Sequence, residues 1–80
     1  MGGTGCVITI SDPLAEIISS PDYSIRSGTE IPPGSYSTRA NRNVSFGGAV
    51  TTWYEISVQG RSGWVPDDGV EIDSKSSACP

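Results

Sequence analysis

The sequence predicts a small all-β domain, a barrel or sandwich of five to six short antiparallel strands. Short β-rich segments recur at intervals of about 8–12 residues, and glycine, proline, serine and aspartate cluster between them. The chain of 80 residues contains 10 Gly and 6 Pro and has no long stretch with helical periodicity. That length corresponds to one domain.

The first half of the chain contains three expected strands. A β-branched run at residues 6–10 (CVITI) predicts the first strand, and residues 14–18 (LAEII) predict the second. Residues 23–30 are expected to form a long, hairpin-like loop. After an Ile-Pro-Pro-Gly turn, residues 35–40 predict a third strand, and residues 41–50 are expected to form a polar loop with two glycines at its tip.

The second half contains the strongest strand signal. Residues 52–58 (TWYEISV) and 63–65 (GWV) flank a Gln-Gly-Arg-Ser turn and predict a β-hairpin. A Pro-Asp-Asp-Gly turn then leads to a further short strand at residues 70–72. We therefore expect residues 1–5 to be a trimmed or added start, residues 6–73 to form the barrel, and residues 74–80 to be a polar tail that carries Cys79.

The phase of the hairpin strands divides their aromatic side chains between two faces. Successive side chains of a strand point to opposite faces, so Tyr54, Ile56 and Val58 share one face and Trp53 lies on the other. Trp64 is likewise out of phase with the glycine and valine that flank it. We expect the Tyr54 face to be the core and both tryptophans to be exposed to a ligand.

Two cysteines lie near the two ends of the chain. A domain of this size buries only about 60% of its unfolded surface, so a covalent staple is expected. Cys6 and Cys79 favour one disulfide that joins the ends. The alternative, two free thiols in a cytosolic protein, stays open at this point.

The composition argues against several classes of function. The chain contains no His, which excludes Ser-His-Asp and Cys-His catalysis and leaves a zinc site short of ligands. We expect no enzyme activity, no metal and no cofactor. The net charge is −4 with five basic residues, so nucleic acid is not an expected partner. No apolar run approaches the roughly 20 residues of a membrane span.

Three arginines are candidates for a small basic site. Arg26, Arg39 and Arg42 all fall in or next to the expected loops, where together they would suit a carboxylate or a phosphate. A dispersed, solvated set is the favoured interpretation.

An ordered set of motifs resembles a known family. SSPD, IPPGSY, WYEI and GWVP follow one another at spacings similar to those of the bacterial SH3-like domains, often called SH3b. The match covers about residues 14–72. The resemblance implies an SH3-like barrel in which the first and last strands are neighbours. Such neighbours would bring together a cysteine before the first strand and one after the last, as in extracellular, disulfide-closed members.

The chain also resembles eukaryotic SH3 domains at their peptide groove. Trp53, Trp64 and Pro66 match three groove positions, whereas Gly69 stands where that pattern has a tyrosine. Eukaryotic SH3 domains also begin with an acidic, tyrosine-rich motif, and in the corresponding segment this chain has Tyr23 only.

The expected function is therefore non-catalytic binding by a secreted or cell-surface bacterial protein. We expect a shallow groove between residues 23–30 and 41–50, with Tyr23, Trp53, Trp64 and Pro66 as ligand-binding residues. The resemblance implies a cell-wall peptide or glycan, or a segment of another protein, as the ligand. The alternative is a structural or assembly module that packs against its parent chain or self-associates through a β-edge.

Overall fold

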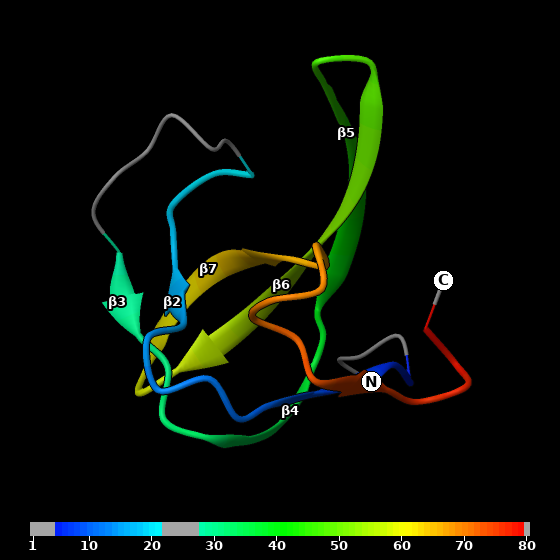
Figure 1. The fold of residues 1–80 in the computed structure, drawn as a ribbon. Helices are drawn as coiled ribbons and strands as arrows, with labels where there is room; N and C mark the ends of the chain where they lie inside the picture. Colours follow the sequence, from blue (N-terminus) through cyan, green and yellow to red (C-terminus); the bar gives the residue numbers. More distant parts are fainter. Residues whose placement is uncertain (1–4, 22–27, 80) are drawn as a thin grey trace.

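The protein is all-β, as the sequence predicts. The computed structural model describes residues 5–21 and 28–79, and within these ranges it contains eight strands in three small antiparallel sheets and no helix. The strands are β1 (Val7–Ile10), β2 (Glu16–Ile17), β3 (Thr29–Glu30), β4 (Gly34–Ser37), β5 (Ala40–Phe46), β6 (Ala49–Val58), β7 (Arg61–Pro66) and β8 (Ser74–Lys75) (Figure 1). Five of these strands have at least four residues, and the other three have two residues each.

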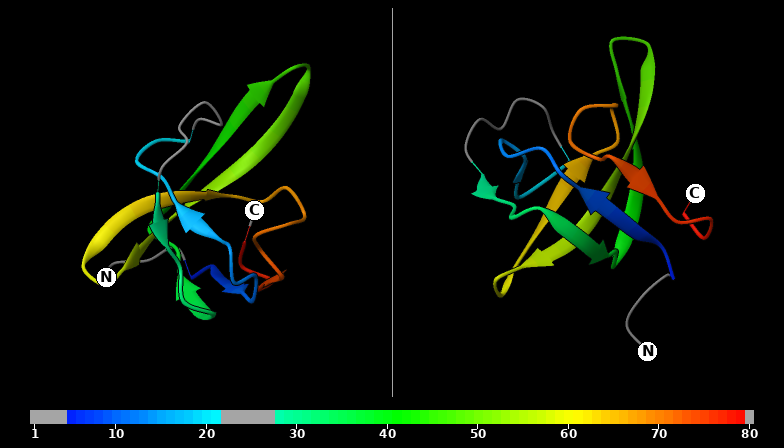
Figure 2. Two further views of the ribbon diagram at one scale, coloured as in Figure 1. Left: turned by 60° about the vertical axis from the view of Figure 1, so that its left-hand side comes forward. Right: turned by 60° about the horizontal axis from the view of Figure 1, so that its bottom comes forward.

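Two sheets of three strands pack around the core, and a two-stranded ribbon lies beside them. The strand orders are β4-β1-β8, β5-β6-β7 and β2-β3. In the first sheet β1 lies between β4 and β8, which is clear in the right panel of Figure 2. The first and last strands of the chain are therefore neighbours.

One continuous segment links the two larger sheets. Residues 34–46 run from β4, which pairs with β1, into β5, which pairs with β6. Between them, Thr38 donates its backbone N–H to the carbonyl of Cys6 at 2.9 Å, and Arg39 donates to the carbonyl of Glu55 at 2.8 Å. The bend at these residues lets one stretch of chain serve both sheets.

The predicted core face of β6 is confirmed. Tyr54, Ile56 and Val58 are all buried. They belong to a cluster that draws on both larger sheets and the ribbon and also contains Cys6, Ile8, Ile10, Ala15, Ile17, Ile31, Val65 and Ile72. At this size one such cluster carries the hydrophobic stabilisation of the domain.

The expectation of a polar loop at residues 41–50 is wrong, because this segment forms most of a β-hairpin. β5 and β6 pair from Ala40–Glu55 to Phe46–Ala49, and the turn between them is Gly47-Gly48, both with positive φ. The hairpin projects from the body of the molecule (Figures 1 and 2). Most of its described side chains are exposed, so the apolar pattern is short, and Gly47-Gly48 is the main hairpin signal in the sequence.

The last strand also lies elsewhere than expected. Residues 70–72 form no strand, and β8 lies at residues 74–75, inside the expected tail. Ile8 and Thr9 of β1 pair with the two residues of β8. Both residues of β8 are polar and exposed, so pairing with β1 rather than burial defines this strand.

The disulfide between Cys6 and Cys79 is present. It joins two residues that are 73 positions apart. The backbone N–H of Ser76 donates to the carbonyl of Val7 at 2.9 Å, which continues the β1–β8 pairing toward Cys79. Structural disulfides are typical of proteins in oxidising compartments.

Candidate functional site

The expected exposure of Trp53 is wrong. Its side chain is 1% exposed. The predicted strand phase is right, because Trp53 lies on the face opposite Tyr54, yet this face is also covered there. Trp53 sits in the central strand of its sheet, opposite Arg42 of β5 and Pro66 of β7. Cross-strand partners on one face lie about 5 Å apart, so neighbours on both sides enclose the indole.

The expected aromatic groove is therefore not formed as predicted. Pro66 is buried, and Trp64 is half-buried. Tyr23 lies outside the described residues. The guanidinium of Arg42 lies over the Trp64 ring, with 5.8 Å from its central carbon to the ring centroid. A cation–π contact of this kind contributes about 0.5–1 kcal/mol at an exposed site, and it places an arginine over the remaining aromatic face.

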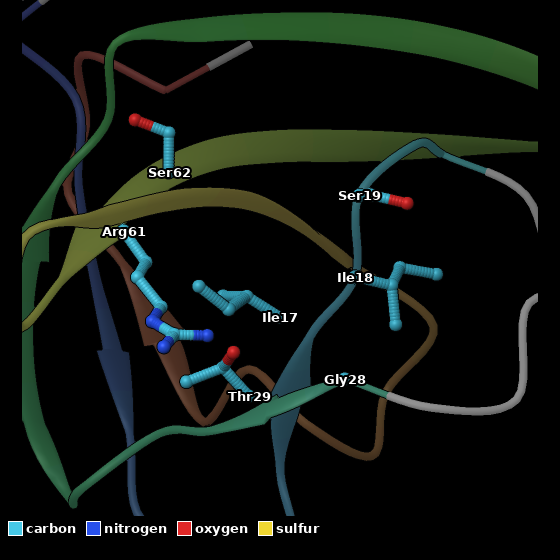
Figure 3. A pocket seen from close by; sticks show the side chains of 7 residues that line it. All are labelled: Ile17, Ile18, Ser19, Gly28, Thr29, Arg61 and Ser62. Atoms are coloured by element: carbon cyan, nitrogen blue, oxygen red, sulfur yellow. The ribbon is translucent and has the colours of Figure 1, made fainter.

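An open pocket lies instead between the β2–β3 ribbon and β7 (Figure 3). We call it the β2–β7 pocket. Its volume is about 600 Å³, and it is lined by Ile17, Ile18, Ser19, Gly28, Thr29, Arg61 and Ser62. Figure 3 shows the Arg61 side chain running past Ile17 toward Thr29, whereas Ser62 points the other way. The pocket thus combines an aliphatic floor, hydroxyl groups and one cation.

Two glycines allow the elements around this pocket to approach closely. A Cβ atom at Gly63 would lie 2.7 Å from the Cβ of Ile17, and a Cβ at Gly28 would lie 2.4 Å from the carbonyl oxygen of Ile17. Both distances are shorter than real contacts allow. Glycine at these positions is what lets Ile17 lie between β3 and β7.

The pocket opens where β2 and β7 stop pairing. Ile18 and Trp64 form one bridge, in which each donates its N–H to the other's carbonyl at 3.0 and 2.7 Å. Beyond Ile18 the chain bends at residues 19–21 instead of continuing along β7. The space between the separating segments is the β2–β7 pocket.

Arg61 is the one charged side chain among the described residues that line the pocket. Arg39 donates from Nη1 to the hydroxyl of Ser62 at 3.1 Å, and this hydroxyl points away from the pocket (Figure 3). Within the described residues the single salt bridge joins Lys75 and Asp67, so neither arginine is neutralised by a described carboxylate. Arg61 was expected in the Gln-Gly-Arg-Ser turn, yet it is the first residue of β7. Its position beside β2 depends on long-range packing that no local pattern reveals.

The structure brings no two described arginines of the candidate basic site into contact. Arg39 reaches Ser62, Arg42 covers Trp64, and Arg26 lies outside the described residues. Arg61, which the basic site did not include, is the arginine that lines the pocket.

Among the described residues that line the pocket, the side chains are aliphatic groups, hydroxyls and one guanidinium. Glu71 lies outside this lining, and its pKa is raised to about 7 by burial, by a side-chain hydrogen bond with Asp68 and by the nearby charges of Asp68 and Asp12. Across residues 5–21 and 28–79, no three Asp, Glu or Cys side chains come together as metal ligands. No helix of the described chain is long and apolar enough to cross a membrane.

Comparison with known proteins gave no matching family model, no matching curated protein and no matching solved structure.

Proposed function

We propose that this chain is an SH3-like, non-catalytic binding module that acts through the β2–β7 pocket. The topology supports the SH3-like assignment together with the ordered motifs. The first and last strands pair, as the resemblance to SH3-like domains implies.

The observation that carries the proposal is the composition of the pocket. An aliphatic floor of Ile17 and Ile18 lies beside Arg61, whose guanidinium has no acidic partner among the described residues. Binding sites combine apolar surface with a few placed polar groups in this way. The described residues that line the pocket include no carboxylate, amine or thiol side chain, which suits binding rather than acid–base catalysis.

The ligand that we propose is a cell-wall peptide or glycan, or a segment of another protein, met at a bacterial cell surface. The resemblance to SH3b domains supports the bacterial wall, and the disulfide supports an oxidising, secreted or surface location. Because Trp53 and Pro66 are buried, we place the ligand contact at the β2–β7 pocket and not at the aromatic face.

Sedimentation with insoluble peptidoglycan tests this function. The wild-type chain is expected in the pellet, and Arg61→Gln is expected to move largely to the supernatant because it removes the pocket's cation. Arg42→Gln makes the same charge change outside the pocket and is expected to sediment like the wild type. A wild-type chain that stays in the supernatant contradicts a wall ligand, and a loss confined to Arg42→Gln contradicts the pocket.

A second function is favoured by the projecting hairpin. The outer edge of β5 has no partner strand among the described residues, and Val50 is 66% exposed. A free edge beside exposed apolar surface suits strand pairing between copies. Under this alternative the purified chain elutes as oligomers, and Val50→Lys restores the monomer; a wild-type monomer at millimolar concentration contradicts it.

A further inference from the structure

The pocket contains an open segment of sheet edge at Ser62. Alternate residues of a strand direct their N–H and C=O groups to the same side. Trp64 directs both groups to Ile18, so those of Ser62, two residues earlier, point to the same side. Ser62 and Ser57 of β6 form a non-hydrogen-bonded pair, so the backbone N–H and C=O of Ser62 point away from β6. No described residue of β2 pairs with them, because β2 has bent away.

The rest of this edge is already closed. Trp64 is bonded to Ile18, and Pro66 has no N–H to donate. Proline on an edge strand limits pairing by another chain. Ser62 is therefore the position on this side of β7 at which an added chain finds both a donor and an acceptor.

We propose that the pocket binds the C-terminal end of an extended peptide, which pairs with Ser62 and places its terminal carboxylate on Arg61. This inference rests on the proposed binding function and names the ligand class. From its partner to Ser62 onward, the peptide takes the path that β2 would follow beyond Ile18. Its earlier residues leave this edge, because Ile18 already pairs with Trp64. Strand addition of this kind supplies backbone hydrogen bonds, and the pocket supplies selectivity.

The direction of the peptide follows from the pairing. β2 runs antiparallel to β7, so a peptide that continues its path passes Ser62 first and then reaches Arg61. One peptide residue pairs with Ser62, and the next peptide residue lies opposite Arg61. The side chain of that second residue points to the same face as Ile17. An aliphatic terminal residue fits there, and its carboxylate ends the chain at the guanidinium.

Charge complementarity supports this occupant. Arg61 is the one charged side chain among the described residues that line the pocket, whereas the chain as a whole carries a net charge of −4. On the ribbon, Glu16 and Glu30 pair with each other. Their side chains therefore lie on the face opposite Ile17 and Thr29, which is the face that Ile18 and Gly28 share.

The test compares three tetrapeptides that differ in the carboxylate. Acetyl-Gly-Ser-Thr-Leu with a free terminus is titrated into the ¹⁵N-labelled chain, beside its C-terminal amide and beside acetyl-Gly-Asp-Thr-Leu amide, which carries the same charge on a side chain. The free acid is expected to bind about tenfold more tightly than either amide, since a charge-assisted hydrogen bond is worth about one factor of ten or more.

Two variants locate the contact. Arg61→Gln is expected to remove the preference for the free acid, and Arg42→Gln is expected to keep it. The amide proton of Ser62 is expected to exchange more slowly with solvent when the free acid is bound, which a charge effect alone would not produce.

Equal affinity of the acid and its amide overturns the inference, as does tighter binding of the aspartyl peptide or unchanged exchange at Ser62. Failure of all three peptides to bind also overturns it. None of these results decides the proposed function, which the sedimentation of Arg61→Gln against Arg42→Gln tests independently.

Discussion

Ile17 lies directly against the backbone of Gly63, with no room for a side chain between them. A Cβ atom at Gly63 would come within 2.7 Å of the Ile17 Cβ and 3.0 Å of its Cδ1. This contact holds the ribbon against β7, and Ile17 is at the same time part of the core and part of the pocket floor. The stability of the domain and the shape of the pocket are coupled through this pair.

Gly63→Ala is therefore expected to destabilise the domain. The added methyl forces Ile17 or β2 to move, and overpacking of this kind costs about 1–3 kcal/mol. Urea unfolding followed by tryptophan fluorescence measures the change. Ser57→Ala, an exposed position on β6, is the control and is expected to stay within about 0.5 kcal/mol of the wild type. Equal stability of the two variants would show that Ile17 does not press on Gly63.

Trp53→Ala is expected to reduce the free energy of unfolding by about 3–5 kcal/mol, because it leaves a cavity at a side chain that is 1% exposed. Val50→Ala, on the same strand at a side chain that is 66% exposed, provides the comparison. Its effect is expected to be within about 0.5 kcal/mol. If thermal melts of the two variants coincide, Trp53 is a surface residue after all.

The disulfide is expected to contribute about 2–4 kcal/mol, largely by restricting the unfolded chain. Cys79→Ser should lower the free energy of unfolding by this amount under oxidising conditions. Alkylation in denaturant without reductant, followed by intact mass, checks the bond itself. An unchanged mass is expected; the addition of two alkyl groups would contradict the bond between Cys6 and Cys79.

Stability is expected to fall as the pH rises from 5 to 8 because of Glu71. Burial, the largest cause, together with hydrogen bonding and charge from Asp68, raises the pKa of this carboxyl from 4.5 to about 7 in the folded state. The folded chain therefore binds more protons than the unfolded chain between these values. The contribution of Glu71 is complete below about pH 4.5 and is lost as the pH passes 7.

Glu71→Gln isolates this effect. The variant is expected to match the wild type near pH 4.5 and to exceed its free energy of unfolding at pH 8, as measured by urea titrations across this range. Glu30→Gln removes a negative charge from an exposed position on β3 and controls for net charge. A Glu71→Gln advantage that is independent of pH would contradict the raised pKa.

The sequence predicted the parts of this protein that burial determines. The alternation of Tyr54, Ile56 and Val58 marked a core strand correctly, because each of these side chains is buried. It failed for Trp53, since alternation assigns a side chain to a face but does not reveal what covers that face. The β5–β6 hairpin was missed because most of its side chains are exposed and its apolar pattern is short. Its Gly47-Gly48 pair was interpreted as the tip of a loop, although such a pair is also typical of a hairpin turn.

The candidate site was the least predictable part. The β2–β7 pocket depends on the divergence of two strands that are more than 40 residues apart in sequence, and Arg61 reads locally as a turn residue. Gly63 was visible in the motif GWV. The sequence could not show that Gly63 leaves space for Ile17, because this contact depends on the packing of β2 and not on any spacing within the motif.

The location of ligand contact tests the central claim most directly. Soluble peptidoglycan fragments and extended peptides are titrated into the ¹⁵N-labelled chain, and the amide shifts are mapped residue by residue. Shifts concentrated at Ile18, Ser19, Thr29, Arg61 and Ser62, with little change at Arg42, are the predicted result. Shifts confined to Arg42, Trp64 and the β5–β6 hairpin would contradict the claim that the β2–β7 pocket is the binding site.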